Sequence, residues 1–376
     1  MRILHLLNEL RFSGAELLLF SAADELNDFA HHSVLSTGDK LGEYAPHLAA
    51  RGYATLHLPF SKSPLYFVQL WKLIRNSGFD IVHVHAERAA FWHCLIVRLA
   101  GKQCLRTVHN TFLFDGGLRT RRGFGRRLLQ RLGVPHIACS TRVAENEWAR
   151  FKLKTQVIQN WFDPARVTLR SDADRITLRK TWSIPTDVFV ISSVGNSGAA
   201  KNHEAIIDCV NAVGETLNLH YIHCGASNES VRSRARPLPE KRIRFLGPTP
   251  EIDELLAITD VFVSPSFFEG GPIALIEAAA AGCLCVTTNV GLANEFVSDD
   301  AVTFIEPSSE SLASALEGLV AADPSRRRTD GRRLAERVRR DFSPSVGAAC
   351  YRKAYEALAE RSRTSRRTSV REPIGI

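Results

Sequence analysis

Short apolar runs of strand type alternate with amphipathic helical stretches along almost the whole chain. The clearest strand-like runs are Arg2–Leu7, Ile81–His85, Leu105–His109, Val188–Val194 and Val261–Pro265. An order of strand, helix, strand, helix predicts mostly parallel sheets that are covered by helices on both faces. The fold class that we predict is therefore α/β, with two doubly wound, Rossmann-like parallel-sheet domains in tandem.

The 376 residues of the chain are enough for two such domains at roughly 150 residues each. We place the N-terminal domain at 1–165 and the second domain at 188–341, with a polar linker over 166–187. A further helix over 342–360 is expected to return to the N-terminal domain. The arginine-rich tail 361–376 has no apolar period, so it is predicted to be disordered.

Composition excludes several classes of protein. Apolar residues make up 45% of the chain and charged residues 23%, which is ordinary for a globular protein and excludes a wholly disordered one.

No apolar run reaches the roughly 18 residues that a membrane span needs. The N-terminus lacks a signal-peptide pattern, because Asn8 and Glu9 interrupt its apolar run, so we expect a cytoplasmic protein. The eight cysteines form no C-x-x-C pair, which favours buried free thiols.

The net charge of +8 indicates an anionic partner, such as nucleic acid, a phosphorylated substrate or a membrane surface. Six arginines and no acidic residue occur in Arg119–Arg131, interleaved with Phe124 and leucines. A basic amphipathic helix of this kind can lie on an anionic membrane surface, which would place the protein at the inner face of a membrane. The alternative is a solvated helix face packed by its leucines. We expect no specific nucleic-acid partner, because the sequence has no recognition helix, zinc spacing or RNP-like run.

The segment Ser264–Glu295 carries the most chemical information in the sequence. A strand ends near its start, Glu269 and the pair Gly270–Gly271 form a tight loop, and a helix follows in which Glu277 lies two turns further along. Free backbone amides at such a helix start can receive a phosphate, and two carboxylates can accept hydrogen bonds from sugar hydroxyls. The alternative is an ordinary buried helix with one solvated glutamate.

Other glycines follow predicted strands at the positions where ligands bind in doubly wound sheets. Gly14 lies just after the first strand, and Gly225 closes a strand in the second half. Gly195 ends the first strand of the second domain and is followed by Asn196 and, at the start of a helix, Lys201. The alternative for Gly14 is a plain turn, and for Lys201 a solvated helix residue.

Three histidines lie on or after predicted strands in the first domain. His109 follows a strand, where it is either functional or structural, and His83 and His85 share one face of another strand by the period of two. Two histidines without a third placed ligand are weak evidence for metal binding, so we predict no metal site. His85 or Glu87 is a candidate for the acceptor side.

The segment FEGGPIALIEAAAAGCLCVTT, with seven residues between Glu269 and Glu277, resembles the nucleotide-sugar motif of glycosyltransferase family 4. The resemblance covers about residues 1–360. It implies the GT-B fold, in which two Rossmann-like domains face each other across a cleft, and a retaining transferase with the donor in the second domain and the acceptor in the first. It also implies that Glu269 contacts the transferred sugar and Glu277 the ribose.

The resemblance extends to other residues. It implies catalytic roles for His109, Glu269 and Lys201. The residues that it places around the donor are Gly14, Gly195, Asn196, Lys201, Gly225, Gly270, Gly271 and Glu277. Asn196 stands where family members usually carry an arginine that binds the diphosphate, so one of two cationic contacts is absent or replaced. No metal or other cofactor is expected, because Lys201 and the helix start would stabilise the leaving diphosphate.

The sequence thus predicts a retaining glycosyltransferase that uses a nucleotide-diphosphate sugar and a glycan or lipid-linked acceptor, in polysaccharide or cell-envelope glycoconjugate synthesis. Three alternatives stay open. The chain could be a sugar-nucleotide epimerase or hydrolase on the same fold, since fold alone does not decide function. It could be an inactive nucleotide-sugar-binding relative, given Asn196. It could also be a nucleic-acid-binding protein, given its charge.

Overall fold

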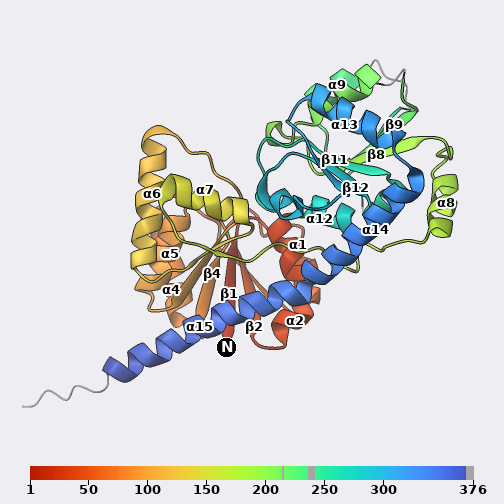
Figure 1. Cartoon of the computed structure of the whole chain (residues 1–376). Helices are drawn as coiled ribbons and strands as arrows, with labels where there is room; N and C mark the ends of the chain where they lie inside the picture. The colour runs from red at the N-terminus through yellow and green to blue at the C-terminus, as the bar shows by residue number, and fades with distance from the viewer. Residues whose placement is uncertain (214–215, 236–241, 250, 370–376) are drawn as a thin grey trace, which may run out of the picture. The chain divides into compact units, whose positions relative to one another are not determined.

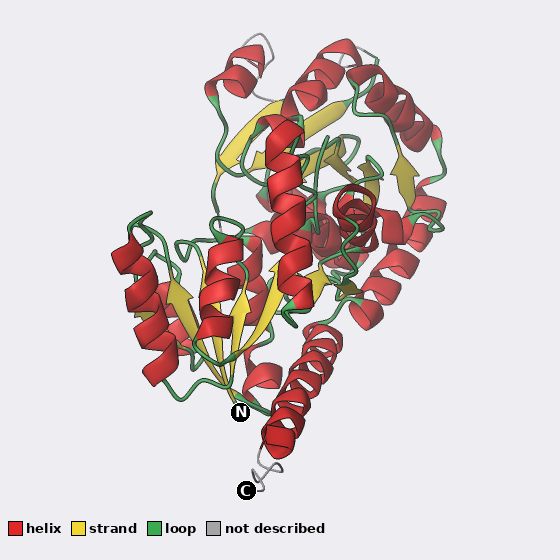
Figure 2. Ribbon diagram, turned by 90° about the vertical axis from the view of Figure 1, so that its left-hand side faces the viewer, coloured by secondary structure: helices red, strands yellow, loops and turns green. Residues whose placement is uncertain are grey.

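The computed structural model describes residues 1–213, 216–235, 242–249 and 251–369, with side chains described up to residue 361 (Figure 1). The chain divides into two compact units. The first unit comprises Met1–Gln159 together with the chain from Pro344 onward, and the second comprises Asn160–Ser343. Each unit is built around its own parallel sheet with helices on both faces, which confirms the predicted fold class (Figure 2).

The first unit contains a seven-stranded sheet in the order β3-β2-β1-β4-β5-β6-β7, with every neighbouring pair parallel. Its strands are β1 (Arg2–Leu7), β2 (His31–Ser36), β3 (Ala54–His57), β4 (Ile81–Val84), β5 (Gln103–Val108), β6 (His136–Ala138) and β7 (Gln156–Val157). The order reverses between β1 and β4, so the carboxyl ends of these two strands flank the switch point at which such sheets bind ligands.

Eight helices cover this sheet within the described residues. They are α1 (Gly14–Ser21), α2 (Ala23–Asn27), α3 (Ala45–Ala50), α4 (Pro64–Asn76), α5 (Ala90–Leu99), α6 (Gly116–Arg131), α7 (Thr141–Phe151) and α15 (Pro344–Ser369). Leu4 and Leu6 of β1 pack on one face against side chains of α4, α5 and α6, such as Tyr66 and Cys94. The other face of the sheet carries the alternate residues of β1 and contacts α15 through β4 and β5.

The second unit contains a six-stranded sheet in the order β10-β9-β8-β11-β12-β13, again parallel throughout. Its strands are β8 (Phe189–Val194), β9 (Leu219–Cys224), β10 (Ile243–Gly247), β11 (Val261–Ser264), β12 (Leu284–Thr287) and β13 (Val302–Phe304). Its helices are α8 (Asp172–Thr181), α9 (His203–Val213), α10 (Glu229–Ala235), α11 (Ile252–Ile258), α12 (Ile273–Ala280), α13 (Ser309–Ala321) and α14 (Pro324–Asp341), with 3-10 turns at Ala199–Lys201 and Gly291–Phe296. The switch point here lies between β8 and β11.

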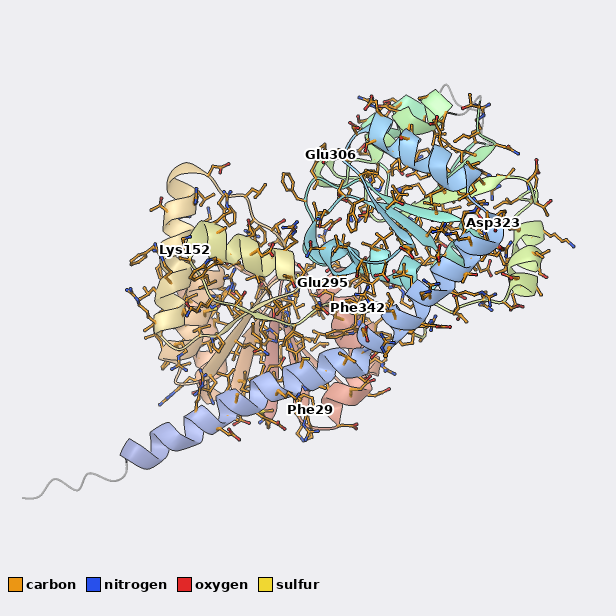
Figure 3. All side chains as sticks on the ribbon, in the orientation of Figure 1. Phe29, Lys152, Glu295, Glu306, Asp323 and Phe342 are labelled. Atoms are coloured by element: carbon orange, nitrogen blue, oxygen red, sulfur yellow. The ribbon has the colours of Figure 1, made fainter. Side chains whose placement is uncertain are left out.

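Several helices begin where the local sequence supplies a cap. Ser63 and Ser140 each accept a hydrogen bond from a backbone amide in the first turn of α4 and α7. Asp323, labelled in Figure 3, caps α14 in the same way and is followed by Pro324, which needs no amide partner at that position. At the other end of α14, Phe342 packs against Phe296, with 5.4 Å between ring centroids. These side chains fix where the helices start and stop.

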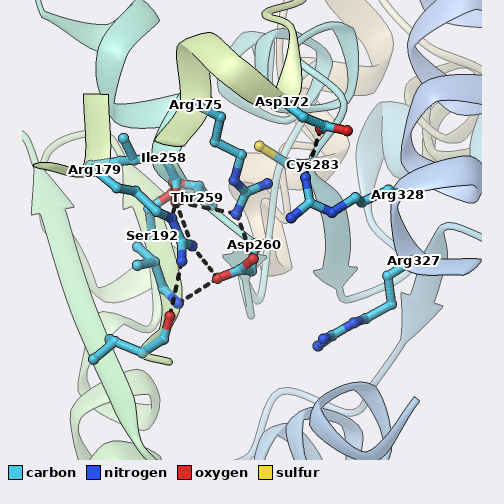
Figure 4. A network of polar contacts seen from close by, with 12 residues as sticks. Asp172, Arg175, Arg179, Ser192, Ile258, Thr259, Asp260, Cys283, Arg327 and Arg328 are labelled. Carbon is cyan, nitrogen blue, oxygen red and sulfur yellow. Dashed lines mark hydrogen bonds and ion pairs between the residues drawn. The ribbon is translucent and has the colours of Figure 1, made fainter. Parts of the chain in front are cut away.

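The segment 166–187, predicted to be a linker, belongs to the second unit and contains α8. Arg175 and Arg179 of α8 both form ion pairs of 2.5 Å with Asp260, just before β11 (Figure 4). The Arg179 side chain also donates to the backbone oxygens of Ile258 and Val188. The polar residues that suggested a linker therefore anchor a helix, and Ser171 and Asp174 start it with a capping box.

The C-terminal region also differs from the expectation. The helix predicted over 342–360 is α15, which runs on to Ser369, so residues 361–369 are helical rather than disordered. The rest of the predicted tail lies outside the described residues. α15 contacts α2, and Arg352 lies over the ring of Phe29, which is labelled in Figure 3, at 5.6 Å from the ring centroid. The helix α15 therefore packs against the N-terminal unit and belongs to it.

The eight cysteines are free, and all but Cys350 are buried. In the described part of the chain, no helix combines the length and the apolar character that crossing a membrane requires.

Candidate functional site

The loops after β8 and β11 bring a lysine and a glutamate together in the second unit. Lys201 Nζ donates a hydrogen bond of 2.7 Å to Glu269 Oε1, and the hydroxyl of Ser266 lies 3.4 Å from the same oxygen. The Phe267 amide donates to the Ala200 carbonyl over 2.7 Å, which ties the two loops to each other. The Lys201 side chain is 32% exposed and that of Glu269 14%, so solvent reaches the pair. We call Lys201, Glu269 and the flanking glycines the second-unit site.

Gly195 makes room for this lysine. It follows β8 with φ +133°, a backbone conformation that side chains disfavour, and a Cβ there would lie 3.2 Å from Lys201 Cε. Gly225 follows β9 with φ +135°, and its Cβ would lie 2.3 Å from the Gly195 carbonyl oxygen. The two glycines therefore allow the ends of β8 and β9 to approach each other closely.

Asn196 has a structural task in this arrangement. Its side-chain oxygen accepts a hydrogen bond of 3.0 Å from the Ala226 amide, and Ser197 donates from its amide to the Ala226 carbonyl over 2.7 Å. The side chain therefore braces the loop after β8 against the loop after β9. A neutral amide in this position offers no charge to a phosphate group.

The Gly270–Gly271 turn packs tightly before α12. Asn160 donates a hydrogen bond of 2.8 Å to the Gly271 carbonyl, and a Cβ on Gly271 would lie 2.4 Å from the Asn160 amide nitrogen. Gly291, with φ +55°, supports the turn from the other side, since its Cβ would lie 2.4 Å from the Gly270 carbonyl oxygen. The turn leads into α12 at Ile273, with Pro272 as its N-cap residue. A small pocket beside this helix start is lined by Lys201, Ser264, Ser266 and Pro272, among others.

Glu277 is buried inside α12, with 3% of its surface exposed. Its nearest cation is Arg166, whose Nε lies 3.7 Å from Glu277 Oε1, and this oxygen has no hydrogen-bond partner within the described residues. Burial raises the pKa of the carboxyl, and Asp163 adds to this, while Arg166 opposes it. A buried carboxylate oxygen without a donor is costly, so the position suits a ligand that brings a hydroxyl group.

Gly14 and His109, the other predicted site residues, belong to the first unit. Gly14 begins α1 after Ser13, whose hydroxyl donates to the buried carboxylate of Glu16. Burial raises the pKa of Glu16. His109 follows β5 and forms a 3.0 Å hydrogen bond between its Nε2 and His85 Nδ1. Burial, with a smaller contribution from Arg106, lowers the pKa of His109 to about 4, so the ring is neutral at pH 7.

The first unit also contains a buried charge network. Arg106, which is 1% exposed, pairs with Glu87, and Arg126 of α6 donates to Glu87 Oε1 over 3.1 Å and to Glu147 over 2.8 Å. Arg122 lies 3.4 Å from Glu87. Glu87, predicted as a candidate for the acceptor side, is therefore held by three arginines. Two of the arginines expected on a basic surface point into the protein.

From the sequence, His83 and His85 alone were considered as metal ligands, and no metal site was predicted. In the described part of the chain, one group of three side chains, His5, His83 and His85, is close enough to share an ion, with one ligand atom of each within 4.8 Å of the others. His5 was not considered from the sequence, because its place beside β4 depends on the strand order. The sequence also pointed to none of three further residues that lie beside the predicted site residues, namely Asn160, Arg166 and Glu16. Two of them follow the last strand of the first sheet, in a stretch with no recognisable pattern.

Comparison with known proteins gives a consistent result for both units. The family model described as Glycosyltransferase Family 4 matches residues 2–166, and the one described as Glycosyl transferases group 1 matches residues 174–332. The structure of Anabaena HepE in complex with UDP superposes with a TM-score of 0.80 at 19% identity, covering 95% of this chain and 100% of that one. This likeness shows the GT-B fold.

Two curated relatives are similar in sequence. One is UDP-Gal:alpha-D-GlcNAc-diphosphoundecaprenol alpha-1,3-galactosyltransferase of Escherichia coli, at 27% identity over 62% of this chain and 64% of that protein. The other is one subunit of the phosphatidylinositol N-acetylglucosaminyltransferase of Arabidopsis thaliana, at 25% identity over 67% of this chain and 57% of that protein. The matches thus span less than two thirds of each relative. Together with the family models, they show that the chain belongs to the group 1 glycosyltransferases of family 4.

Proposed function

We propose that the chain is a retaining glycosyltransferase that moves a sugar from a nucleotide-diphosphate sugar to a glycan or lipid-linked acceptor, in polysaccharide or cell-envelope glycoconjugate synthesis. The observation that carries the proposal is the Lys201–Glu269 pair at the carboxyl edge of the second sheet. It supplies one cation for a diphosphate and one carboxylate for sugar hydroxyls. The family of the chain supports the reaction class, and the acceptor named for the Escherichia coli relative supports a lipid-linked acceptor.

In this proposal the donor binds to the second unit. Lys201 gives a point charge to the diphosphate, and the backbone amides at the start of α12 add partial positive charge. Asn196 supplies no second cation, because its side chain is an uncharged amide. Binding therefore depends more strongly on Lys201 than in a site with two cations, and it needs no divalent metal. Glu277 Oε1, which lacks a donor among the described residues, accepts a hydrogen bond from a ribose hydroxyl.

The proposed transfer exchanges one bond at the anomeric carbon for another. The bond between the anomeric carbon and the diphosphate oxygen breaks, and a bond from the acceptor oxygen to the same carbon forms. The acceptor proton passes to an oxygen of the departing diphosphate, whose growing charge Lys201 stabilises. Glu269 orients the transferred sugar. His109 contributes from the first unit as a neutral ring that accepts a hydrogen bond.

The exposed surface of α6 combines basic and apolar side chains. Arg119, Arg121, Arg127 and Arg131 are exposed, and Leu118, Phe124 and Leu132 are 43%, 62% and 39% exposed beside them. Exposed apolar side chains among arginines fit a surface that meets anionic headgroups and the boundary of the acyl chains. We propose that α6 holds the protein at a membrane that carries the acceptor.

Replacing Glu269 with glutamine tests the enzyme proposal. Glu269→Gln keeps the size of the side chain but removes the charge that pairs with Lys201, so we expect kcat to fall by about 10²–10³-fold, the scale for losing one preorganised electrostatic contact. Transfer is measured with labelled UDP-, GDP- and ADP-sugars and lipid-linked acceptors, and NMR of the product gives its anomeric configuration. Glu317→Gln, an exposed position on α13, is the matched control.

Undiminished turnover of Glu269→Gln would remove the residue from the site. An inverted anomeric configuration would contradict retention. Formation of an epimer or a free sugar in the absence of acceptor would favour the epimerase or hydrolase alternative.

A further inference from the structure

Four histidines of the first unit form one continuous chain of hydrogen bonds across the sheet. His32 Nδ1 lies 2.9 Å from His5 Nε2, His5 Nδ1 lies 3.0 Å from His85 Nε2, and His85 Nδ1 lies 3.0 Å from His109 Nε2. The residues come from β2, β1 and the ends of β4 and β5, which are neighbours in the sheet. His32 and His5 are buried, and His85 and His109 are partly exposed. The chain therefore leads from the interior to the end of β5.

One end of this chain fixes the position of every proton in it. His32 Nε2 lies 3.2 Å from the Leu26 carbonyl oxygen, which can only accept, so this nitrogen carries the proton. In a neutral ring the other nitrogen, Nδ1, must then accept, and it accepts from His5 Nε2. The same rule passes along the chain. His5 Nδ1 accepts from His85 Nε2, and His85 Nδ1 accepts from His109 Nε2.

The last ring is left with an unprotonated nitrogen. His109 donates through Nε2, so its Nδ1 holds a lone pair, and no side chain or backbone group among the described residues pairs with that atom. The rings are neutral at pH 7, because burial lowers the pKa of His32 and His109 to about 4 and those of His5 and His85 well below the usual value.

We propose that His32, His5 and His85 are positioning residues that hold His109 in a single tautomer, with the proton on Nε2 and a hydrogen-bond acceptor on Nδ1. That nitrogen is then ready to receive a hydroxyl group. The assignment of the hydroxyl to a sugar rests on the proposed function, but the tautomer does not. His83 supports the arrangement from the side, because its ring lies against that of His85, with 3.9 Å between centroids and 37° between the planes, and is itself held by Tyr355 and Thr107 at 2.7 Å each.

A metal ion at His5, His83 and His85 is the competing use of the same rings. Such an ion would replace the His5–His85 hydrogen bond and break the chain. Both ring nitrogens of His5, His83 and His85 already have hydrogen-bond partners, namely other histidines for His5 and His85, and Tyr355 and Thr107 for His83. An ion would therefore cost each of these rings a hydrogen bond that it already makes, and it would leave the former partners unpaired. The hydrogen-bonded chain is the better account of the geometry.

The tautomers can be read directly by NMR. In the full-length protein labelled with ¹⁵N-histidine, long-range proton–nitrogen correlation spectra at pH 7 distinguish protonated from unprotonated ring nitrogens, and single substitutions assign the signals. We expect His109, His85, His5 and His32 all to be neutral with the proton on Nε2. A wild-type spectrum in which His109 is protonated on Nδ1, or is charged, would overturn the proposal without any variant being needed.

Two variants of His32 test the dependence on the anchor. His32→Leu removes the acceptor for His5 Nε2, so the chain can reverse, and we expect a second His109 signal set with the proton on Nδ1. His32→Gln can still donate to Leu26 and accept from His5, so it should keep the wild-type His109 spectrum. An unchanged His109 spectrum in folded His32→Leu would show that the chain does not set its tautomer.

Titration with zinc distinguishes the hydrogen-bonded histidine chain from a metal site at the same rings. We expect stoichiometric zinc to leave the nitrogen shifts of His5, His83 and His85 unchanged, and shifts of all three would overturn the proposal in favour of a metal site. None of these spectra depends on turnover. A failure of the glycosyltransferase proposal would therefore appear in the transfer assay and leave the tautomer result intact.

Discussion

At the scale of single residues, the second-unit site depends on two carboxylates with different surroundings. Glu269 reaches solvent and is paired with Lys201, whereas Glu277 is buried with Arg166 at 3.7 Å and has one oxygen without a donor among the described residues. Burial makes the carboxyl of Glu277 costly to ionise and raises its pKa. This difference suits Glu269 to an exposed sugar hydroxyl and Glu277 to a ligand group that replaces water.

Glu277→Gln should change the pH dependence of stability. The pKa of Glu277 is raised above its ordinary value of 4.5, so the folded state keeps this proton to a higher pH than the unfolded state. The carboxyl therefore favours folding least at high pH, and its contribution to the unfolding free energy falls as pH rises from 4.5 through the raised pKa. The glutamine variant would have no such dependence. The Tm of the variant should therefore exceed that of the wild type by an amount that grows towards pH 7. Each kcal/mol of difference in unfolding free energy corresponds to about 2–4 °C in Tm.

Differential scanning calorimetry between pH 4.5 and 7.5 measures this difference. Glu317→Gln should show a small difference that does not depend on pH, because its side chain is exposed. A Tm difference for Glu277→Gln that stays constant with pH would contradict the account of a buried carboxyl.

The residues that could be predicted from the sequence are those that lie within one segment. Glu269, Gly270, Gly271 and Glu277 are close in the chain, and the structure places them on one loop and helix. The partners of these residues were not predictable. Arg166 approaches Glu277 from the start of the second unit, across more than a hundred residues of chain, and only the packing of α12 brings them together.

At the scale of elements, the second-unit site depends on how closely the strand ends of β8 and β9 approach each other. Gly225→Ala tests this approach, because its Cβ would lie 2.3 Å from the Gly195 carbonyl and its φ is +135°. The backbone must move, so we expect a loss of about 1–3 kcal/mol in unfolding free energy together with loss of nucleotide binding. Thermal unfolding and nucleotide titration measure the two effects.

Gly198→Ala is the matched control for that change. Gly198 lies in the neighbouring loop with an extended backbone, and nothing lies within 4 Å of its Cβ position. The unfolding free energy of Gly198→Ala should stay within about 0.5 kcal/mol of that of the wild type. Equal behaviour of the two variants would show that the approach of the strand ends is not restrictive.

The exposed face of α6 is a second test at this scale. Replacing Arg119, Arg121, Arg127 and Arg131 with serine removes four charges without touching the buried Arg126, so we expect binding to vesicles of anionic lipid to weaken. Each basic residue near such a surface contributes about 1 kcal/mol. Cosedimentation with vesicles at fixed salt measures the change.

A variant with the same net charge provides its control. Arg326, Arg333 and Arg340 of α14 and Arg352 of α15 are exposed, and their replacement with serine should leave more of the vesicle binding intact. Equal losses in the two variants would indicate a general charge effect and contradict a membrane surface on α6.

Elements were predictable where the local pattern matched the final packing. The run Arg2–Leu7 was predicted as a strand and is β1 with the same bounds. Its residues after Arg2 are all buried, because both faces of this parallel sheet are covered, and such a strand appears in the sequence as a continuous apolar run. α8 was missed because its residues are mostly polar, and its place is set by two arginines that reach Asp260 in another part of the chain. α15 continues past residue 360 because arginine is a good helix former even without an apolar period.

At the scale of the whole molecule, the two units repeat one architecture with different side chains at the strand ends. The first unit carries a row of histidines across β2, β1, β4 and β5, and the second carries glycines, Lys201 and two glutamates at β8, β9 and β11. Neutral acceptors suit hydroxyl groups, whereas a lysine at a helix start suits a phosphate. The division of labour that we propose, with acceptor on the first unit and donor on the second, follows from this difference.

Calorimetric titration of UDP-, GDP- and ADP-sugars, in the presence of EDTA, tests this account most directly. We predict that one nucleotide class binds to the wild type and that Lys201→Met weakens it by about 10–100-fold, the scale for losing a hydrogen bond to a charged group. Lys180→Met, an exposed lysine on α8, should bind as the wild type does. Equal affinity of Lys201→Met and the wild type, or no binding of any nucleotide sugar, would contradict the assignment of the donor to the second unit.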